Sequence, residues 1–325
     1  MIRNLLTKVM LGALLIPLAN VAAMAQAATT SATTTQVAAD PGGNQGGPEA
    51  VWYDGKGSVW IANQFHNSVS QISTSNGALA ATYAVGAGPV ALASDGKSLW
   101  IANLRDNTVV KLNTANGNIS ATFSVPGGPG GLAWDGSNMW VTCRENNTVV
   151  KLTSAGIVAT TVTVGRRPLG IAYDSATATV WVANNLSDTV TKLAASDGAT
   201  LGTFATGRGP FGVLAAFGSI FVSNFFDGTL TKLSPDGLTT SSILVGDGAA
   251  GMTADTANVW VANNGVNTVT KLNASTGAVS RFPTGRGPFG VVLDGTGAFW
   301  TSNFSSGTVS TSKSAATLIA PVATN

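Results

Sequence analysis

Arginines placed beside phenylalanines in one glycine-proline setting are the residues of this sequence best suited to bind a ligand. The heptapeptide GRGPFGV occurs twice and places Arg208 and Arg286 three residues before Phe211 and Phe289. A guanidinium group offers a planar set of donors that matches a carboxylate or a phosphate, and an aromatic ring covers apolar surface. These stretches therefore predict a cationic and aromatic surface that suits a ligand with carboxylate or phosphate groups.

The elements that must position these residues come from a repeat. Seven aromatic residues follow one another at intervals of about 40 residues: Trp60, Trp100, Trp140, Trp181, Phe221, Trp260 and Trp300. Within each copy, stretches rich in β-branched and aromatic residues alternate with turn formers such as Asp95-Gly96, which predicts four short strands. A repeat of this length is typical of a propeller blade. The sequence predicts an all-β fold, a seven-bladed β-propeller with four antiparallel strands per blade, in which the repeated aromatic residue packs between blades.

The chain divides into three parts. Residues 1–27 combine a basic start, a short apolar run and Ala-Gln-Ala, which predicts a cleaved secretory signal. Residues 28–46 form an N-terminal segment, and 47–325 form the propeller. Either 33–37 or 316–320 could supply the strand that closes the ring, and the sequence leaves this choice open. We expect a monomer in the periplasm or outside the cell, without membrane insertion after cleavage.

Composition narrows the function classes. Removal of Arg3 and Lys8 with the signal lowers the 17 basic residues to 15, equal to the 15 acidic ones, which argues against a protein that coats nucleic acid. Cys143 is the only cysteine, so no internal disulfide forms, and its place in a repeated strand predicts burial. His66 is the only histidine, and no group of closely spaced metal ligands is present. We therefore predict no catalytic residue, no metal and no cofactor.

The repeat carries a family resemblance. Residues 182–190, VANNLSDTV, are a clear example of a unit that recurs along the chain. This unit resembles that of the YVTN-repeat family, which consists of secreted or surface bacterial propellers. The resemblance implies a binding or surface role, although the repeat specifies a fold more closely than an activity.

The chain is also similar to the streptogramin B (virginiamycin B) lyases, seven-bladed enzymes that open a cyclic depsipeptide antibiotic by elimination with magnesium. In that family a histidine directly follows a repeat proline, and a carboxylate ends a Trp-x-x-Glu strand. The residues after the proline position are here Glu49, Val90, Gly130, Leu169, Phe211, Ala250 and Phe289, and the strand-ending residues are six asparagines and Cys143. The resemblance therefore implies the fold, while the missing histidine and glutamate argue against the reaction.

The alternating strand direction sorts the loops onto two faces. The loop before the first strand and the loop between the second and third strands open on the same face, which receives six of the seven arginines left after signal removal and no lysine. The predicted ligand site on this face consists of Arg166, Arg167, Arg208, Arg286, Phe211, Phe225, Phe226, Phe289 and Phe304. In an alternative interpretation, the arginines pair with neighbouring acidic residues such as Asp227, and Phe211 and Phe289 plug the central channel.

These observations predict an exported, non-catalytic binding module that uses the arginine- and phenylalanine-bearing face. The expected partner is an anionic small molecule, a peptide, an envelope polymer or a single-stranded nucleic acid, each of which has carboxylate or phosphate groups. Two alternatives stay open. One is a diverged lyase of the streptogramin type with magnesium-dependent elimination, and the other is a structural protein of a surface or matrix.

Overall fold

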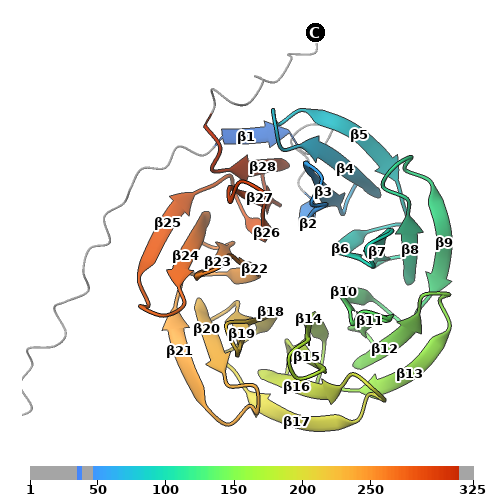
Figure 1. Ribbon diagram of the computed structural model, residues 1–325, viewed down its shortest axis with the longest axis vertical. Helices are drawn as coiled ribbons and strands as arrows, with labels where there is room; N and C mark the ends of the chain where they lie inside the picture. Colours follow the sequence, from blue (N-terminus) through green and yellow to red (C-terminus); the bar gives the residue numbers. More distant parts are fainter. Residues whose placement is uncertain (1–34, 39–46, 315–325) are drawn as a thin grey trace, which may run out of the picture.

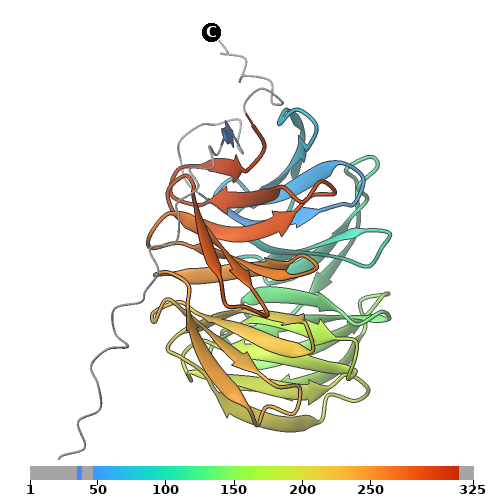
Figure 2. The ribbon, with the colours of Figure 1, turned by 60° about the vertical axis from the view of Figure 1, so that its left-hand side comes forward.

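The chain forms seven four-stranded antiparallel sheets arranged in a ring, in a computed structural model that describes residues 35–38 and 47–314 (Figure 1). The turned view shows the sheets packed face to face around this ring (Figure 2). The predicted seven-bladed propeller is confirmed. The predicted signal at 1–27 and the segment 316–320 lie outside the described residues, and the described part contains no helix that could cross a membrane.

Each blade runs from an innermost strand at the channel to an outermost strand at the rim. The innermost strands are β2 (Pro48–Tyr53), β6 (Pro89–Ser94), β10 (Pro129–Trp134), β14 (Pro168–Asp174), β18 (Pro210–Ala216), β22 (Ala249–Ala254) and β26 (Pro288–Leu293). The second strands are β3 (Ser58–Asn63), β7 (Leu99–Asn103), β11 (Asn138–Cys143), β15 (Thr179–Asn184), β19 (Ser219–Asn224), β23 (Asn258–Asn263) and β27 (Phe299–Asn303). The third strands are β4 (Ser68–Ser73), β8 (Thr108–Leu112), β12 (Thr148–Thr153), β16 (Thr189–Ala194), β20 (Thr229–Leu233), β24 (Thr268–Asn273) and β28 (Thr308–Thr311). The outermost strands are β5 (Leu79–Ala84), β9 (Ile119–Ser124), β13 (Val158–Thr163), β17 (Thr200–Ala205), β21 (Thr240–Leu244), β25 (Val279–Pro283) and β1 (Thr35–Ala38).

The hydrophobic cores lie between neighbouring blades. Trp100 of the second blade packs in one cluster with Met139, Val141 and Leu152 of the third. All seven repeated aromatic residues are at most 5% exposed. The indole N–H of Trp100 is satisfied because it donates to Asp95 Oδ2 at 2.9 Å. The predicted role of the repeated aromatic residue in packing between blades is confirmed.

The N-terminal segment closes the ring. β1 pairs with β28 in antiparallel register, with Thr35 opposite Thr311, and is the outermost strand of the seventh sheet. In Figure 1 this strand lies beside the red C-terminal blade and next to the blade that contains β2. A strand from the start of the chain thus completes the last blade, and this pairing covers an edge of the third strand that would otherwise be exposed.

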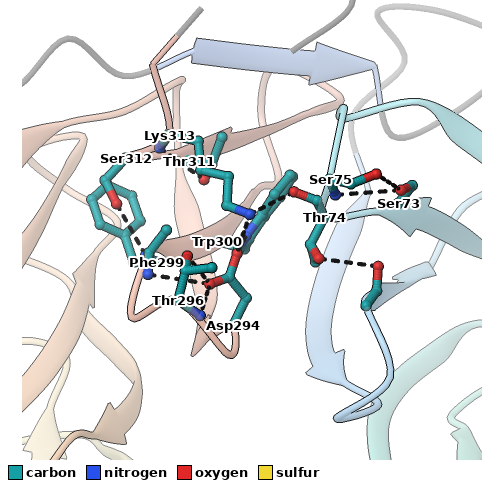
Figure 3. Close-up of polar contacts among 12 residues, drawn as sticks. Ser73, Thr74, Ser75, Asp294, Thr296, Phe299, Trp300, Thr311, Ser312 and Lys313 are labelled. Carbon is teal, nitrogen blue, oxygen red and sulfur yellow. Dashed lines mark hydrogen bonds and ion pairs between the residues drawn. The ribbon is translucent and has the colours of Figure 1, made fainter. Parts of the chain in front are cut away.

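A lysine after β28 adds a polar contact at the same junction (Figure 3). Lys313 Nζ lies 2.9 Å from Asp294 Oδ2 in the seventh blade and donates to the carbonyl of Thr74 in the first blade at 2.6 Å. The indole of Trp300 donates to the same Asp294 oxygen at 2.9 Å. The Asp294 side chain is only 1% exposed, so its charge depends on these partners. The contact joins the last blade to the first.

Glycine lets the innermost strands approach one another. The second residue after the proline position is glycine in five blades: Gly131, Gly170, Gly212, Gly251 and Gly290. A Cβ atom on Gly170 would lie 2.3 Å from the carbonyl oxygen of Phe211 in the next blade, closer than any side-chain atom can come. The missing side chains therefore allow the inner ring to close around a narrow channel.

The loops that carry the candidate residues share one face. We call the loop before each innermost strand the leading loop, and the loop between the second and third strands the middle loop. Phe226 N in a middle loop donates to Arg208 O in the leading loop of the same blade at 3.2 Å. The middle loop also holds the leading loop of the following blade, since Asn147 Oδ1 accepts a bond from Arg167 N at 2.8 Å. The face predicted from strand alternation is thus the one that these loops form.

Candidate functional site

The central channel widens on the loop face into a cavity of about 420 Å³. Residues from two repeat positions line it, namely the position after the proline and the position after the strand-ending residue. Glu49 and Phe289 are examples of the first, and Arg144 and Phe304 of the second. Its deeper wall consists of apolar residues three positions after the proline: Val51, Leu92, Leu132, Ile171, Val213, Met252 and Val291. A cavity of this size, with both polar and apolar groups in its lining, suits a small ligand.

Phe211 of the fifth blade and Phe289 and Phe304 of the seventh line one side of the cavity. We call these three residues, together with Phe225 that packs against two of them, the aromatic wall. The sixth blade has Ala250 after the proline position, and this small residue leaves Phe211 and Phe289 free to meet, with ring centroids 5.6 Å apart. Phe225 packs against both of them, and Phe289 meets Phe304 edge to face at 5.3 Å. The rings are half-buried and offer a continuous apolar surface.

The aromatic surface continues outward on the loop face. Phe226, which is 62% exposed, packs edge to face on Phe225. Phe65, which the sequence analysis did not include, lies 5.4 Å from Phe304 between ring centroids and is 50% exposed. The guanidinium of Arg105 lies 5.5 Å from the Phe65 ring centroid. These residues form the outer margin of the site.

The rest of the cavity has a charged arc, made of Glu49, Arg144 and Arg167 from the first, third and fourth blades. Among the described residues, none of these three side chains makes a hydrogen bond or an ion pair within 4.0 Å. Burial raises the pKa of Glu49 to about 7, against the opposing effect of the Arg144 charge. Burial also lowers the pKa of Arg144, and Glu49 opposes this effect. Glu49 and Arg144 thus interact electrostatically, but neither side chain makes a hydrogen bond within the described part of the protein.

Arg167 has an unusual backbone conformation. Its φ is +52°, in the left-handed region, and the corresponding residue of every other leading loop is glycine, with Gly209 at +63° as one example. A residue with a side chain pays about 1 kcal/mol or more for this conformation. Such strain is concentrated at functional sites. The conformation therefore favours a functional reason for the arginine at this position.

The other three predicted arginines do not line the cavity. Arg166, Arg208 and Arg286 are exposed on the loop face. Arg208 Nε lies 2.7 Å from Asp227 Oδ1, and hydrogen bonds from Arg208 lower the pKa of that carboxyl. Arg166 instead donates to the carbonyl of Leu186 at 2.8 Å. The alternative in which arginines pair with neighbouring acids thus describes Arg208 correctly.

Sequence reasoning did not select two of the three charged residues that line the cavity. Glu49 was noted only as a residue after the proline position, and Arg144 only as an arginine of the loop face. The signal that identifies both is the repeat position, because most residues directly after the proline position, and three of the seven directly after the strand-ending residue, line the cavity. The predicted Phe211, Phe289, Phe304 and Arg167 occupy these positions or neighbour them.

Two further predictions concern reactive side chains. Cys143 is fully buried, as predicted, and burial raises its pKa to about 12, so its thiol is a poor nucleophile. His66 is exposed in a middle loop and does not line the cavity. In residues 35–38 and 47–314, no three His, Cys, Asp or Glu side chains gather in a way that could hold a metal ion.

Several solved structures have a fold similar to that of this chain. The chain superposes with a TM-score of 0.74 on a hydrazine synthase of Kuenenia stuttgartiensis, at 18% identity over 83% of this chain and 96% of the other. The similarity is one of fold. A streptogramin B lyase matches with the same TM-score at 17% identity, covering 86% of this chain and 97% of the lyase. A catalytically inactive virginiamycin B lyase of Staphylococcus aureus, solved with quinupristin, matches with a TM-score of 0.74 at 18% identity over 86% of this chain and 98% of the lyase.

Neither a family model nor a curated protein matches the chain. The solved relatives support a propeller of the virginiamycin B lyase type as the fold. Membership of the YVTN-repeat family stays a prediction from the repeat unit, and so does the loss of lyase activity.

Proposed function

We propose that this protein is a binding module whose channel mouth takes a small ligand with an apolar group and a carboxylate or a phosphate. The observation that carries the proposal is the composition of one cavity, in which an aromatic wall faces guanidinium groups without protein partners. The volume of about 420 Å³ favours a small molecule or the end of a chain over a flat polymer surface.

The strained arginine supports the same conclusion. Glycine would relieve the conformation of Arg167, as the other leading loops demonstrate. The arginine side chain makes no hydrogen bond or ion pair with any described residue of the protein, which supports contact with a ligand as the reason for its presence. Arg144 lines the same cavity, and two guanidinium groups suit a planar carboxylate or a phosphate better than one.

The test measures ligand binding and stability in the same variants. Calorimetric titration with 3-phenylpropanoate and phenyl phosphate should give saturable binding to the parent protein. Replacement of Arg167 by Gly should raise the free energy of unfolding by about 1 kcal/mol and weaken binding about tenfold or more, since charged hydrogen bonds are lost. Phe289→Ala should weaken binding through the lost aromatic surface.

A matched control separates the cavity from the general charge of the face. Arg286→Gln removes an arginine that, unlike Arg167, does not line the cavity, and it should leave both affinities within about twofold. Equal affinities of the parent, Arg167→Gly and Phe289→Ala proteins would contradict the proposal. The alternative in which the protein is a structural component of a surface or matrix predicts that these substitutions leave binding unchanged.

A diverged lyase is a second candidate, favoured by the position of Glu49. A carboxyl with a pKa of about 7 that faces a cavity is suited to proton transfer near neutral pH. The test is product analysis after incubation of a cyclic depsipeptide with the protein, with and without magnesium. A ring-opened product that Glu49→Gln no longer forms would support this candidate over simple binding.

Export completes the proposal. The basic and apolar start of the sequence supports a cleaved signal, which would place the binding site in the periplasm or outside the cell. The N-terminal sequence of protein recovered from the producing cell tests this point, and cleavage after Ala27 is the expected result.

A further inference from the structure

We propose that the cavity selects a zwitterion, an amino acid or a short peptide with an apolar side group, whose ammonium group meets Glu49 while its carboxylate meets Arg144 and Arg167. The side group would lie on the aromatic wall. This inference rests on the proposed function and specifies the ligand class of the same cavity.

The first argument is charge complementarity. The cavity contains one carboxyl and two guanidinium groups, and none of them has a hydrogen-bonded partner among the described residues. A ligand with only an anionic group would bring its charge close to Glu49 as well as to the arginines. A purely cationic ligand would meet two guanidinium groups. A ligand that carries both charges is the one that satisfies all three residues, because each of its charges finds an opposite one.

The second argument is the order of the groups around the ring. The aromatic wall comes from the fifth and seventh blades, with β18 and β26 as innermost strands, and the charged arc comes from the first, third and fourth, with β2, β10 and β14 (Figure 1). Glu49 therefore adjoins one end of the wall and Arg167 the other. The backbone of Glu49 is held at the seventh blade, since its carbonyl accepts a bond from Ser302 Oγ at 2.6 Å. A bound molecule can thus rest on the wall and reach both signs of charge.

The third argument concerns protonation. The charged groups that line the cavity with Glu49 are Arg144 and Arg167, and His66 on the loop after β3 does not line it. A carboxyl that titrates near neutral pH becomes ionised more readily when an ammonium group arrives. Binding of a zwitterion should therefore strengthen as the pH rises from 6 to 8, whereas a simple anion should bind more weakly over that range.

The experiment compares three ligands that share one phenyl group. L-phenylalanine carries both charges, 3-phenylpropanoate lacks the ammonium group, and 2-phenylethylamine lacks the carboxylate. Calorimetric titration at pH 6 and pH 8 should show that L-phenylalanine binds about tenfold more tightly than either analogue at pH 8, as expected for one additional charge-assisted hydrogen bond. The preference over 3-phenylpropanoate should shrink at pH 6.

Two variants locate the effect. Glu49→Gln keeps the size of the side chain and should remove the preference for L-phenylalanine over 3-phenylpropanoate, while Arg144→Gln should remove the preference over 2-phenylethylamine. Arg286→Gln should change neither. The fold of each variant is checked by its unfolding midpoint in urea.

The outcomes separate the two proposals. If 3-phenylpropanoate binds at least as tightly as L-phenylalanine at pH 8, the zwitterion inference is wrong while the proposed function stands. If neither these three ligands nor phenyl phosphate binds at millimolar concentration, both are contradicted. A tenfold preference that Glu49→Gln leaves intact would also overturn the inference, because the ammonium group would then be recognised elsewhere.

Discussion

Replacement of Glu49 by Gln should stabilise the protein, and the gain should depend on pH in a defined way. Burial raises the pKa of this carboxyl from its usual 4.5 to about 7 in the folded protein. Below about pH 4.5 the residue is protonated in both the folded and the unfolded states, so it contributes no difference. As the pH rises towards 7, the unfolded state loses the proton first and is stabilised relative to the folded state. The free energy of unfolding therefore decreases over this window.

The size of the effect follows from the two pKa values. One pKa unit corresponds to about 1.4 kcal/mol, so the rise from 4.5 to about 7 sets an upper limit of about 3 kcal/mol. Because Glu49 is only half-buried and faces a cavity open to solvent, screening reduces this value. We expect Glu49→Gln to be more stable than the parent by about 1–3 kcal/mol at pH 8, and by almost nothing at pH 4.5.

The assay is urea unfolding followed by tryptophan fluorescence, for the parent and the variant at half-unit steps from pH 4.5 to 8.5. Asp227→Asn is a suitable control, since it neutralises a partly exposed carboxyl whose pKa is lowered by Arg208 and should therefore destabilise at high pH. A stability difference between Glu49→Gln and the parent that is constant across the range would refute the reasoning. So would a carboxyl pKa near 4.5 measured for Glu49 by carbon NMR. The stability that Glu49→Gln is expected to gain equals the stability that the natural glutamate takes from the fold. Such a loss is common for groups that bind ligands.

Three further predictions concern the scaffold. Gly170→Ala should lower the free energy of unfolding, measured by calorimetry, by about 1–3 kcal/mol, because its Cβ would lie 2.3 Å from a neighbouring carbonyl oxygen. Gly130→Ala, whose Cβ would have its nearest atom at 3.5 Å, should be neutral or slightly stabilising. Equal effects of the two substitutions would contradict the close approach of the inner strands. Lys313→Met should cost about 3 kcal/mol in urea unfolding because the buried Asp294 loses its ammonium partner, and Asp294→Asn in the same chain should restore part of the loss. Cys143 should react with an aromatic disulfide reagent only after unfolding, and rapid labelling of the native protein would show that the thiol is accessible.

The repeat explains why so much of the fold could be predicted. The spacing of Trp60, Trp100 and their counterparts reflects one packing contact that is repeated between blades, and such a contact leaves a periodic trace in the sequence. The face of each loop could also be predicted, because strand direction alternates along a blade. Phe211 and Phe289 were selected for the candidate site on these grounds, and both line the cavity.

The direction of each loop side chain was decided by the tertiary structure. Arg166 and Arg167 are neighbours in the sequence, yet only Arg167, with its left-handed backbone, lines the cavity. Arg208 meets Asp227 in the middle loop of its own blade, whereas the seventh blade has Ser306 at the position of Asp227, so Arg286 lacks this acidic neighbour. The backbone angle at Arg167 and the meeting of the two loops both recur along the repeat, but the direction that each arginine side chain takes is set by its own neighbours in the folded protein.

The sequence by itself determined a ring of seven blades and the face on which arginine and phenylalanine gather, because both follow from repeated local patterns. Only the closed ring brings Glu49 of the first blade into one cavity with Arg144 of the third and the aromatic wall of the fifth and seventh. Each of these residues is a deviation from its own repeat, and deviations in separate copies carry no information about one another. Their meeting results from ring closure, which brings the innermost strand of every blade to the same channel.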